Sequence, residues 1–284
     1  MRVLVTGAGG QLGIDLVRCC EAAGDDVTAT NHGDLDISDR DAVHGAISML
    51  RPDVVVNCAA WTAVDACESD PDRAAAQNGL AVRWLAESCD RAAARLVQIS
   101  TDYVFDGALD RPYNEWDDPA PQSVYGASKL SGEREASVLG SAATVVRTSW
   151  VCSQNGSNMV KTIMRLAGVH DRLAFVDDQI GCPTFTGDLA PVVRRLAVER
   201  RAGIHHVTNQ SSTSWYGFAC DVVSAMGKDP AMVRPISTTE LKPARPAQRP
   251  ANSVLDNAVL RLAGIPLLRD YREALRETVD ALGK

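Results

Sequence analysis

Short, mostly apolar runs recur through the first half of the chain and predict buried parallel strands. The runs are RVLVT (2–6), DVTAT (26–30), DVVVN (53–57), RLVQIS (95–100) and ATVVRT (143–148). They do not alternate strictly between apolar and polar residues, which is typical of strands covered on both faces. Helical patterns at 11–23, 39–50, 71–91 and 125–139 lie between them. This alternation predicts an α/β fold, a Rossmann-like doubly wound parallel sheet built from right-handed βαβ units.

The regular alternation fades after about residue 150. Helical patterns follow at 157–168, 187–200, 215–226 and 269–282, separated by short strands and longer loops. The segment KPARPAQRPANS (242–253) holds three prolines and predicts an ordered loop. We therefore expect a dinucleotide-binding domain over 1–150 and a smaller α/β substrate lobe over 151–284. Whether the chain crosses between the two parts stays open.

Composition excludes several classes of function. The 284 residues are 45% hydrophobic and 23% charged, with a net charge of −7, which argues against nucleic-acid and anionic-membrane partners. The chain holds no apolar run of the ~18 residues that a membrane span needs. Eight cysteines without a CxxC pair indicate free, mostly buried thiols. The chain starts directly with a strand pattern rather than a secretory signal, so we expect a cytoplasmic protein.

A glycine-rich turn follows the first predicted strand. VLVTGAGGQLG places Gly7, Gly10 and Gly13 between that strand and the first helix, with Gln11 and Leu12 at the helix start. Glycine there permits a tight turn and close approach of a diphosphate to the helix N-terminus. No Lys-Ser or Lys-Thr follows, which excludes a Walker-type loop. The turn therefore predicts a dinucleotide site.

The choice between NADH and NADPH is left open by the residues after the second strand. An acidic residue there would favour NAD and an arginine NADP, but the chain has Asn31, His32 and Gly33. Asp36 and Ile37 follow and are candidates to lie against the adenine ring. Ser38 or Asp39 is expected to cap the next helix.

Tyr125 and Lys129 in SVYGASKLSGER lie four residues apart, on one face of a predicted helix. The spacing alone does not establish a function. However, T-G-x-x-G-x-x-G followed about 115 residues later by Y-x-x-x-K resembles the extended short-chain dehydrogenase/reductase family. ISTDYVF (99–105) fits that pattern, with Thr101 at the family's Ser/Thr position. Further segments are similar to the dTDP-4-dehydrorhamnose reductase family within it: 51–70, 100–107, 147–151, 177–184 and 249–256.

The resemblance implies hydride transfer from NADPH or NADH to the C4 keto group of a dTDP-4-keto-6-deoxyhexose, such as dTDP-4-dehydro-L-rhamnose. Tyr125 would then donate the proton to the C4 oxygen. Lys129 would lower the pKa of Tyr125, because its cation favours the tyrosinate, and would hold the nicotinamide ribose. Thr101 would hydrogen-bond the same oxygen.

The resemblance also implies a set of binding residues. The implied cofactor contacts include Tyr125 and Lys129 together with Gly7, Gly10, Gln11, Leu12, Gly13, Asn31, Asp36, Ile37, Ala59, Ala60 and Thr62. The implied substrate contacts are Thr62, Thr101, Asp102, Tyr103, Trp150, Asn158 and Arg249. Arg249 would clamp the diphosphate, although Arg245 and Arg234 are alternatives in the same region. Alternatively, Trp150 would be a buried core residue and Asn158 would cap a helix.

Two other functions compete with this interpretation. One is a 4-ketoreductase that makes another dTDP-deoxysugar, since a single sequence does not fix the stereochemistry at C4. The other is a non-catalytic NAD(P)-binding regulatory subunit, which the presence of Thr101, Tyr125 and Lys129 disfavours. Some members of the resembling family use Mg²⁺ in dimer assembly, but no acidic cluster here places a metal. Whether the protein forms a homodimer stays open as well.

Overall fold

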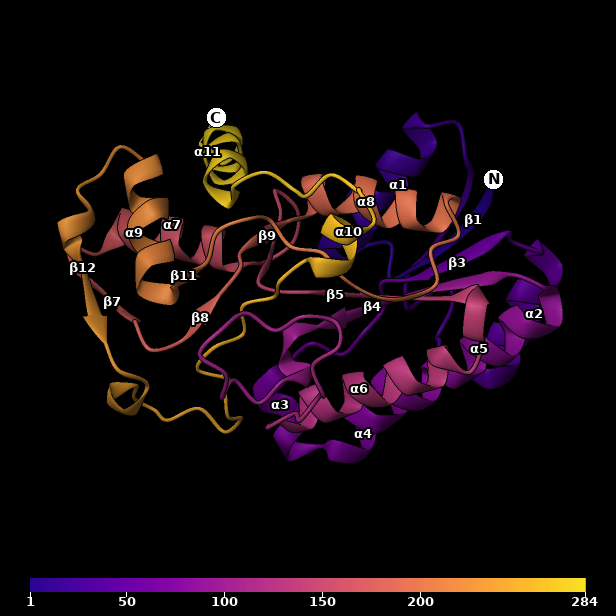
Figure 1. The fold of residues 1–284 in the computed structure, drawn as a ribbon. Helices are drawn as coiled ribbons and strands as arrows, with labels where there is room; N and C mark the ends of the chain where they lie inside the picture. Colours follow the sequence, from indigo (N-terminus) through magenta and orange to yellow (C-terminus); the bar gives the residue numbers. More distant parts are fainter. Residues whose placement is uncertain (284) are drawn as a thin grey trace.

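A six-stranded, wholly parallel sheet forms the centre of the molecule (Figure 1). The structure is a computed structural model that describes residues 1–283. The strands run in the order β10–β5–β4–β3–β1–β2. Their bounds are β1 (Arg2–Thr6), β2 (Asp26–Thr30), β3 (Val54–Asn57), β4 (Arg95–Thr101), β5 (Ala143–Thr148) and β10 (Gly203–His206). The five strands predicted in the first half, and the doubly wound α/β fold, are confirmed.

Helices cover both faces of this sheet (Figure 1). One face carries α1 (Gln11–Ala22) and α8 (Thr186–Val198), and the other carries α2 (Arg40–Leu50), α5 (Ala81–Ala92) and α6 (Val124–Ser137). Within β1, Val3 and Val5 pack toward α1 and α8, whereas Leu4 packs toward α2 and α5. Both sides of the pleat are therefore buried, which explains the continuous apolar runs.

Residues beyond 150 return to the central sheet. The edge strand β10 pairs with β5, and α8 packs against α1 in the same apolar cluster. Asp15 on α1 accepts hydrogen bonds from Ser153 (3.2 Å), Asn155 (3.2 Å) and Thr186. The second half of the chain thus contributes to both parts of the molecule.

The helix predicted over 71–91 is confirmed, and it contains one π-helical turn. The structure has α3 (Val64–Ser69), α4 (Pro71–Ala75), a π-helical turn (Ala76–Leu80) and then α5. In the π turn the buried Asn78 accepts from Trp61 N at 2.8 Å and donates to Trp61 O and Ser128 Oγ, each at 3.0 Å. These tertiary bonds hold the loop after β3 against α6. The apolar spacing of the segment predicts the helix but does not reveal these bonds or the π turn.

The remaining residues form a smaller α/β lobe, at the left of Figure 1. Its core joins Ile163, Phe218 and Tyr271 from three helices. The lobe contains three two-stranded pairs, β6 (Val151–Cys152) with β9 (Thr184–Phe185), β7 (Leu173–Val176) with β12 (Val233–Ile236), and β8 (Ile180–Gly181) with β11 (Thr213–Ser214). Its helices are α7 (Met159–Val169), α9 (Trp215–Ala225) and α11 (Tyr271–Leu282); the short α10 (Ala258–Leu262) packs on the central sheet.

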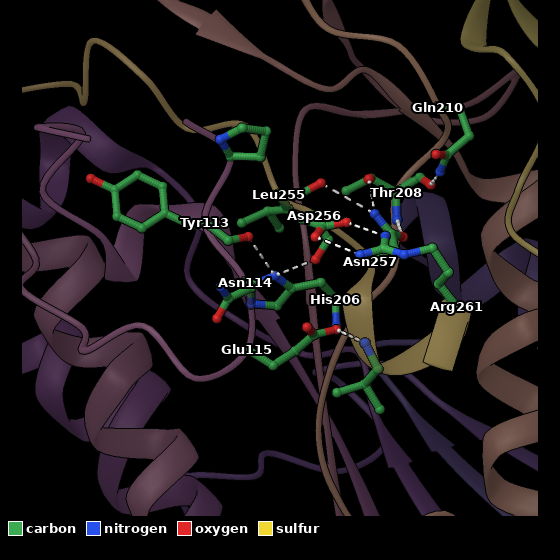
Figure 2. Close-up of polar contacts among 12 residues, drawn as sticks. Tyr113, Asn114, Glu115, His206, Thr208, Gln210, Leu255, Asp256, Asn257 and Arg261 are labelled. Carbon is green, nitrogen blue, oxygen red and sulfur yellow. Dashed lines mark hydrogen bonds and ion pairs between the residues drawn. The ribbon is translucent and has the colours of Figure 1, made fainter. Parts of the chain in front are cut away.

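A buried polar junction ties the C-terminal segment to the end of β10 (Figure 2). His206 Nδ1 lies 3.1 Å from the carbonyl oxygens of Tyr113 and Asp256, and Glu115 accepts from His206 N at 3.0 Å. Burial and the nearby Arg147 lower the pKa of His206 to about 3, so the ring is neutral and its Nδ1–H donates. This junction fixes where residues 249–255 re-enter the molecule.

Close backbone contacts at α6 allow a test of packing. A Cβ on Gly132 would lie 2.2 Å from Asn78 O, whereas a Cβ on Gly45 in α2 would meet nothing within 4 Å. Gly132→Ala should lower the free energy of unfolding by about 1–3 kcal/mol. Gly45→Ala, the matched control, should leave it unchanged or raise it by about 0.4–1 kcal/mol. Urea unfolding measures both, and equal effects would contradict the packing described.

Candidate active site

Two cavities open beyond the carboxyl ends of the central strands. The larger, which we call the catalytic cavity after the predicted catalytic residues that line it, has a volume of about 460 Å³. The smaller, the glycine-turn cavity, has a volume of about 300 Å³. They share Gly10, Cys58 and Ala60, so they adjoin. Both lie beyond the ends of the neighbouring strands β1 and β3, between which the strand order reverses direction. Open α/β sheets bind ligands at this point.

The predicted glycine turn fits a dinucleotide diphosphate. Gly7 has φ +67°, and a Cβ there would lie 2.5 Å from Ala59 N. A Cβ on Gly13 would lie 2.3 Å from Gly7 O, so the first helix must start tight against the turn. No side chain caps α1, whose first residues Gln11 and Leu12 line the catalytic cavity. The free N–H groups of this helix start are suited to phosphate oxygens.

Some of the residues after β2 line the glycine-turn cavity, and others pack against the turn or cap a helix. Asp36 and Ile37 line the glycine-turn cavity, whereas Asn31 does not, and its side chain packs against Gly9. Asp39 caps α2, accepting at 3.0 Å from the N–H groups of the first helical turn. Hydrogen bonds from Ser38 hold the pKa of the Asp36 carboxyl below its ordinary value.

Arg73 is a residue of the glycine-turn cavity that the sequence analysis missed. It lines the cavity near His32, and its guanidinium lies 4.4 Å from the centre of the Trp61 ring. The cavity is therefore lined by an arginine that contacts the Trp61 ring, although no arginine follows β2 directly. The sequence carries no signal for it, because Arg73 comes from the helical segment 43 residues beyond Thr30, the end of that strand.

The catalytic cavity brings together Thr101, Tyr125 and Lys129. Thr101 ends β4, and the other two lie one turn apart on α6. Ser123 caps α6 by accepting from Gly126 N at 3.1 Å. A Cβ on Gly126 would lie 2.2 Å from Tyr103 O, so the helix begins in backbone contact with the turn that follows Thr101. This contact fixes the tyrosine relative to the threonine.

Burial shifts the pKa values of the helical pair in opposite directions. Desolvation lowers the pKa of Lys129 to about 8, and the nearby charge of Glu133 only partly offsets this by raising it. The Lys129 Nζ donates a hydrogen bond to Ile99 O at 2.7 Å. Desolvation raises the pKa of Tyr125, and an interaction with the Thr101 hydroxyl, which lowers it, is the smaller effect. Burial therefore dominates the shift of Tyr125, and the expected lowering of its pKa by Lys129 stays a prediction. Tyr125 is protonated at neutral pH and can act as an acid.

Beneath Lys129 lies a buried network that the sequence analysis also missed. Glu133 on α6 pairs with Arg147 on β5 through two hydrogen bonds of 2.9 and 2.7 Å, and it accepts a third from Ser100 on β4. The two side chains of the ion pair are only 3% and 2% exposed. One helix and two strands are thereby joined behind the predicted catalytic side chains.

Four of the predicted substrate contacts besides Thr101 line the catalytic cavity: Thr62, Asp102, Tyr103 and Trp150. Trp150 has φ +46° and stacks on Trp215, with the ring centres 3.5 Å apart. Trp215, from α9, is a further cavity residue that the sequence analysis missed. Thr148 is another, and its hydroxyl is buried without a hydrogen-bond partner among residues 1–283.

Asn158 and Arg249 do not line this cavity. Asn158 caps α7, the alternative role named for it, and also donates to Gln11 Oε1 at 3.0 Å. Arg249 lies in a separate cavity of about 410 Å³ with Arg245 and pairs with Asp65 at 2.5 and 2.7 Å. Its side chain is 9% exposed, compared with 49% for Arg245, while Arg234 lies on β12 outside that cavity.

Comparison with known proteins places the chain in a family. The family described as "RmlD substrate binding domain" matches residues 1–283. The chain belongs to the RmlD family. A dTDP-4-dehydrorhamnose reductase of Streptomyces griseus is 46% identical over 99% of this chain and 94% of its own length.

Two further relatives of this RmlD-family chain differ in their printed activity and in their identity to it. A probable dTDP-4,6-dihydroxy-2-methyloxan-3-one 4-ketoreductase of Streptomyces antibioticus is 44% identical over 98% of this chain and 94% of its own. A dTDP-4-dehydrorhamnose reductase of Bacillus anthracis, solved in complex with NADP, is 36% identical and covers 99% of both chains, with a TM-score of 0.94. The resemblance stated from the motifs is thus confirmed at the level of the RmlD family.

Two features are absent from the part of this RmlD-family chain that the structure describes. Within residues 1–283, no group of three His, Cys, Asp or Glu side chains is arranged to hold a metal ion. Over the same residues, no helix is both long enough and apolar enough to cross a membrane. The cysteines are free, and most are buried, as predicted.

The buried network on α6 of this RmlD-family chain offers a matched pair of mutations. Glu133→Ala leaves Arg147 charged and buried, and should lower the free energy of unfolding by about 3–5 kcal/mol. Glu135→Ala, two residues along the same helix, removes an equally direct pair with Arg83, which is half exposed. Solvent screens that pair, so stability should barely change. Chemical denaturation distinguishes them; a stable Glu133→Ala protein would contradict the role assigned to the network.

Proposed function

We propose that this chain reduces the C4 keto group of dTDP-4-dehydro-L-rhamnose with NAD(P)H, giving dTDP-L-rhamnose. The observation that carries the proposal is the convergence of Thr101, Tyr125 and Lys129 in one cavity that adjoins the glycine turn. The names of the full-length relatives support the substrate class.

The proposed mechanism assigns one task to each side chain. When bound, the reduced nicotinamide supplies the hydride. Tyr125, protonated at neutral pH, donates its proton to the C4 oxygen as negative charge develops there. Thr101 hydrogen-bonds in the same region, and Lys129 is available to hold the nicotinamide ribose once its bond to Ile99 O is exchanged. Tyr125 and Lys129 are 8% and 4% exposed, so a cofactor and substrate that fill the cavity would leave little room for water at the reacting atoms.

The proposed cofactor site extends from the catalytic cavity into the glycine-turn cavity. The diphosphate would lie on the turn from Gly7 to Gly13, and the adenine beside Asp36 and Ile37. Ala59, Ala60 and Thr62 would line the path between them. Asn31 would shape this site through Gly9. Arg73 gives the adenosine end a positive charge, which favours the 2′-phosphate of NADPH over NADH.

Turnover by the purified protein tests the proposal. NADPH and NADH oxidation is followed with dTDP-4-dehydro-L-rhamnose, and the product is identified by NMR. Formation of dTDP-L-rhamnose is expected, with NADPH preferred. Oxidation only with a different dTDP-4-ketosugar would favour the second candidate, a 4-ketoreductase that makes another deoxysugar. The 44% identity to the Streptomyces antibioticus enzyme supports this candidate. Cofactor binding without turnover of any ketosugar would indicate a regulatory subunit.

Tyr125→Phe tests the proton donor. The change removes only the hydroxyl, so kcat should fall by about 100-fold or more while NAD(P)H binding stays nearly constant. Tyr216→Phe, on α9 and outside the catalytic cavity, is the matched control and should retain full activity. Steady-state kinetics and fluorescence titration of NAD(P)H give both quantities. Equal loss of binding and turnover would mean that Tyr125 has a structural role.

Arg249 is proposed to contact the substrate diphosphate, held in place by Asp65. Loss of a charge-assisted contact in Arg249→Ala should raise KM for the sugar nucleotide by about tenfold or more, with KM for NAD(P)H unchanged. Arg234→Ala serves as control, because this arginine lies on the exposed β12. If Arg245→Ala gives the larger KM change instead, the clamp belongs to the more exposed arginine.

A further inference from the structure

Glu133 lies one helical turn beyond Lys129 on α6, and both side chains are withdrawn from water. Glu133 is 2% exposed and Lys129 is 4% exposed. Residues four apart share one face of a helix, with their Cβ atoms about 5–6 Å apart. Side chains also lean toward the helix N-terminus, so Glu133 is directed back toward the turn of Lys129. Opposite charges placed in this way interact strongly, because little water is present to screen them.

The strand β4 holds both side chains at consecutive residues. Lys129 Nζ donates to the carbonyl oxygen of Ile99 at 2.7 Å. The next residue, Ser100, donates through its hydroxyl to Glu133 Oε1 at 2.5 Å. The ammonium and the carboxylate are therefore fixed by neighbouring positions of one strand as well as by one face of one helix.

Arg147 binds the same carboxylate but extends toward the edge strand β10. Two of its nitrogens donate to Glu133 at 2.9 and 2.7 Å, and Nη1 lies 3.5 Å from His206 Nε2. Its guanidinium also lies over the Phe105 ring, 5.1 Å from the ring centre. Lys129 lines the catalytic cavity, whereas Arg147 does not. Glu133 is therefore the member of the ion pair whose charge acts on Lys129.

This arrangement opposes the effect of burial on Lys129. Desolvation lowers the pKa of Lys129 to about 8, and the charge of Glu133 is the larger of two influences that raise it, ahead of Cys58. The bonds from Arg147 and Ser100 compensate the carboxylate for its lost hydration. Without the carboxylate, burial would bring the pKa of the lysine closer to neutrality.

We propose that Glu133 is a positioning residue that acts through Lys129: its carboxylate keeps the Lys129 ammonium charged at neutral pH, and Arg147 keeps that carboxylate ionised. The inference rests on the proposed function, in which a cationic Lys129 holds the nicotinamide ribose and favours the tyrosinate form of Tyr125. The ion pair thus acts on the reaction as well as anchoring α6.

Other titratable groups of the cavity do not take the place of this carboxylate. Those that line it with Lys129 are Cys58, Asp102, Tyr103 and Tyr125. Burial raises the pKa of the thiol and of both phenols, which are therefore neutral at pH 7. Burial raises the pKa of Asp102 to about 6, and its carboxylate accepts from the Thr101 hydroxyl at 2.9 Å.

An NMR titration of Lys129 tests the proposal without cofactor or substrate. The chain has five lysines, so the Cε signals of ¹³C-lysine-labelled protein are few, and Lys129→Arg identifies the one required. Lys129 should titrate near pH 8 in wild type. In Glu133→Gln the midpoint should lie about one pH unit lower or more, because the anion is lost and Arg147 is left unneutralised.

Glu135→Gln is the matched control for this titration. It makes the same chemical change two residues along α6, in the half-exposed pair with Arg83. Solvent screens that pair, so the Lys129 midpoint should stay at its wild-type value. An unchanged midpoint in Glu133→Gln, or an equal shift in Glu135→Gln, overturns the proposal.

A double variant decides if Glu133→Gln does not fold. Glu133→Gln combined with Arg147→Met leaves no buried charge unpaired, a replacement that buried ion pairs often tolerate. Because the carboxylate is the charge that acts on Lys129, the midpoint should again lie below the wild-type value. A wild-type midpoint in the double variant overturns the proposal.

The pH dependence of NADPH binding connects the charge to the reaction. If only the cationic form of Lys129 holds the ribose, the Kd for NADPH rises with pH above the Lys129 midpoint. At pH 8 the Kd of Glu133→Gln should exceed that of wild type by about threefold or more, as measured by fluorescence titration. Equal Kd values despite a shifted midpoint overturn the role in the reaction. Absence of any ketosugar reduction by wild type, with the expected midpoints and Kd values, would instead overturn the proposed function.

Discussion

The ion pair between Glu133 and Arg147 holds the catalytic helix to the sheet. Both charges are almost completely withdrawn from water, and three hydrogen bonds to the carboxylate compensate the loss of hydration. The pair joins α6 to β4 and β5, whose carboxyl ends carry Thr101 and Thr148. Because the pair is bidentate, it fixes the rotation of α6 as well as its distance from the sheet. The direction in which Tyr125 and Lys129 point depends on that rotation.

Close backbone contacts complete what the ion pair begins. Gly126 lets α6 start against the carbonyl of Tyr103, and Gly132 lets it lie against the π turn at Asn78. Asn78 in turn holds the loop after β3, which separates the two cavities. The same close packing that positions the side chains also removes their solvent. Desolvation is therefore the largest influence on the pKa values of Asp102, Tyr125 and Lys129.

The catalytic cavity is closed by the second half of the chain. Trp150 and Trp215 stack at its edge, and Ser253 faces Asp102 from the segment that pairs with Ile180. The polar junction of His206, Glu115 and Asp256 determines where that segment runs (Figure 2). Asp65 draws the proline-containing loop toward α3 through Ala247 and Arg249. Substrate selection in the proposed reductase would thus rest on contacts between residues far apart in sequence.

The sequence by itself determined the central fold, because strands buried on both faces must be apolar throughout and their helices must be amphipathic. It also determined the glycine turn, a short spacing at one strand–helix junction. Thr101, Tyr125 and Lys129 lie on two elements, β4 and α6, and were named together only through the family resemblance. The tertiary structure decided what depends on long-range contact. No sequence pattern pairs Arg147, in the predicted strand 143–148, with Glu133, in the predicted helix 125–139. Only packing shows that these two charges neutralise each other, and that the predicted helix over 71–91 contains a π turn held by Asn78. The signs of the pKa shifts were likewise decided by packing, because desolvation depends on which elements cover a side chain.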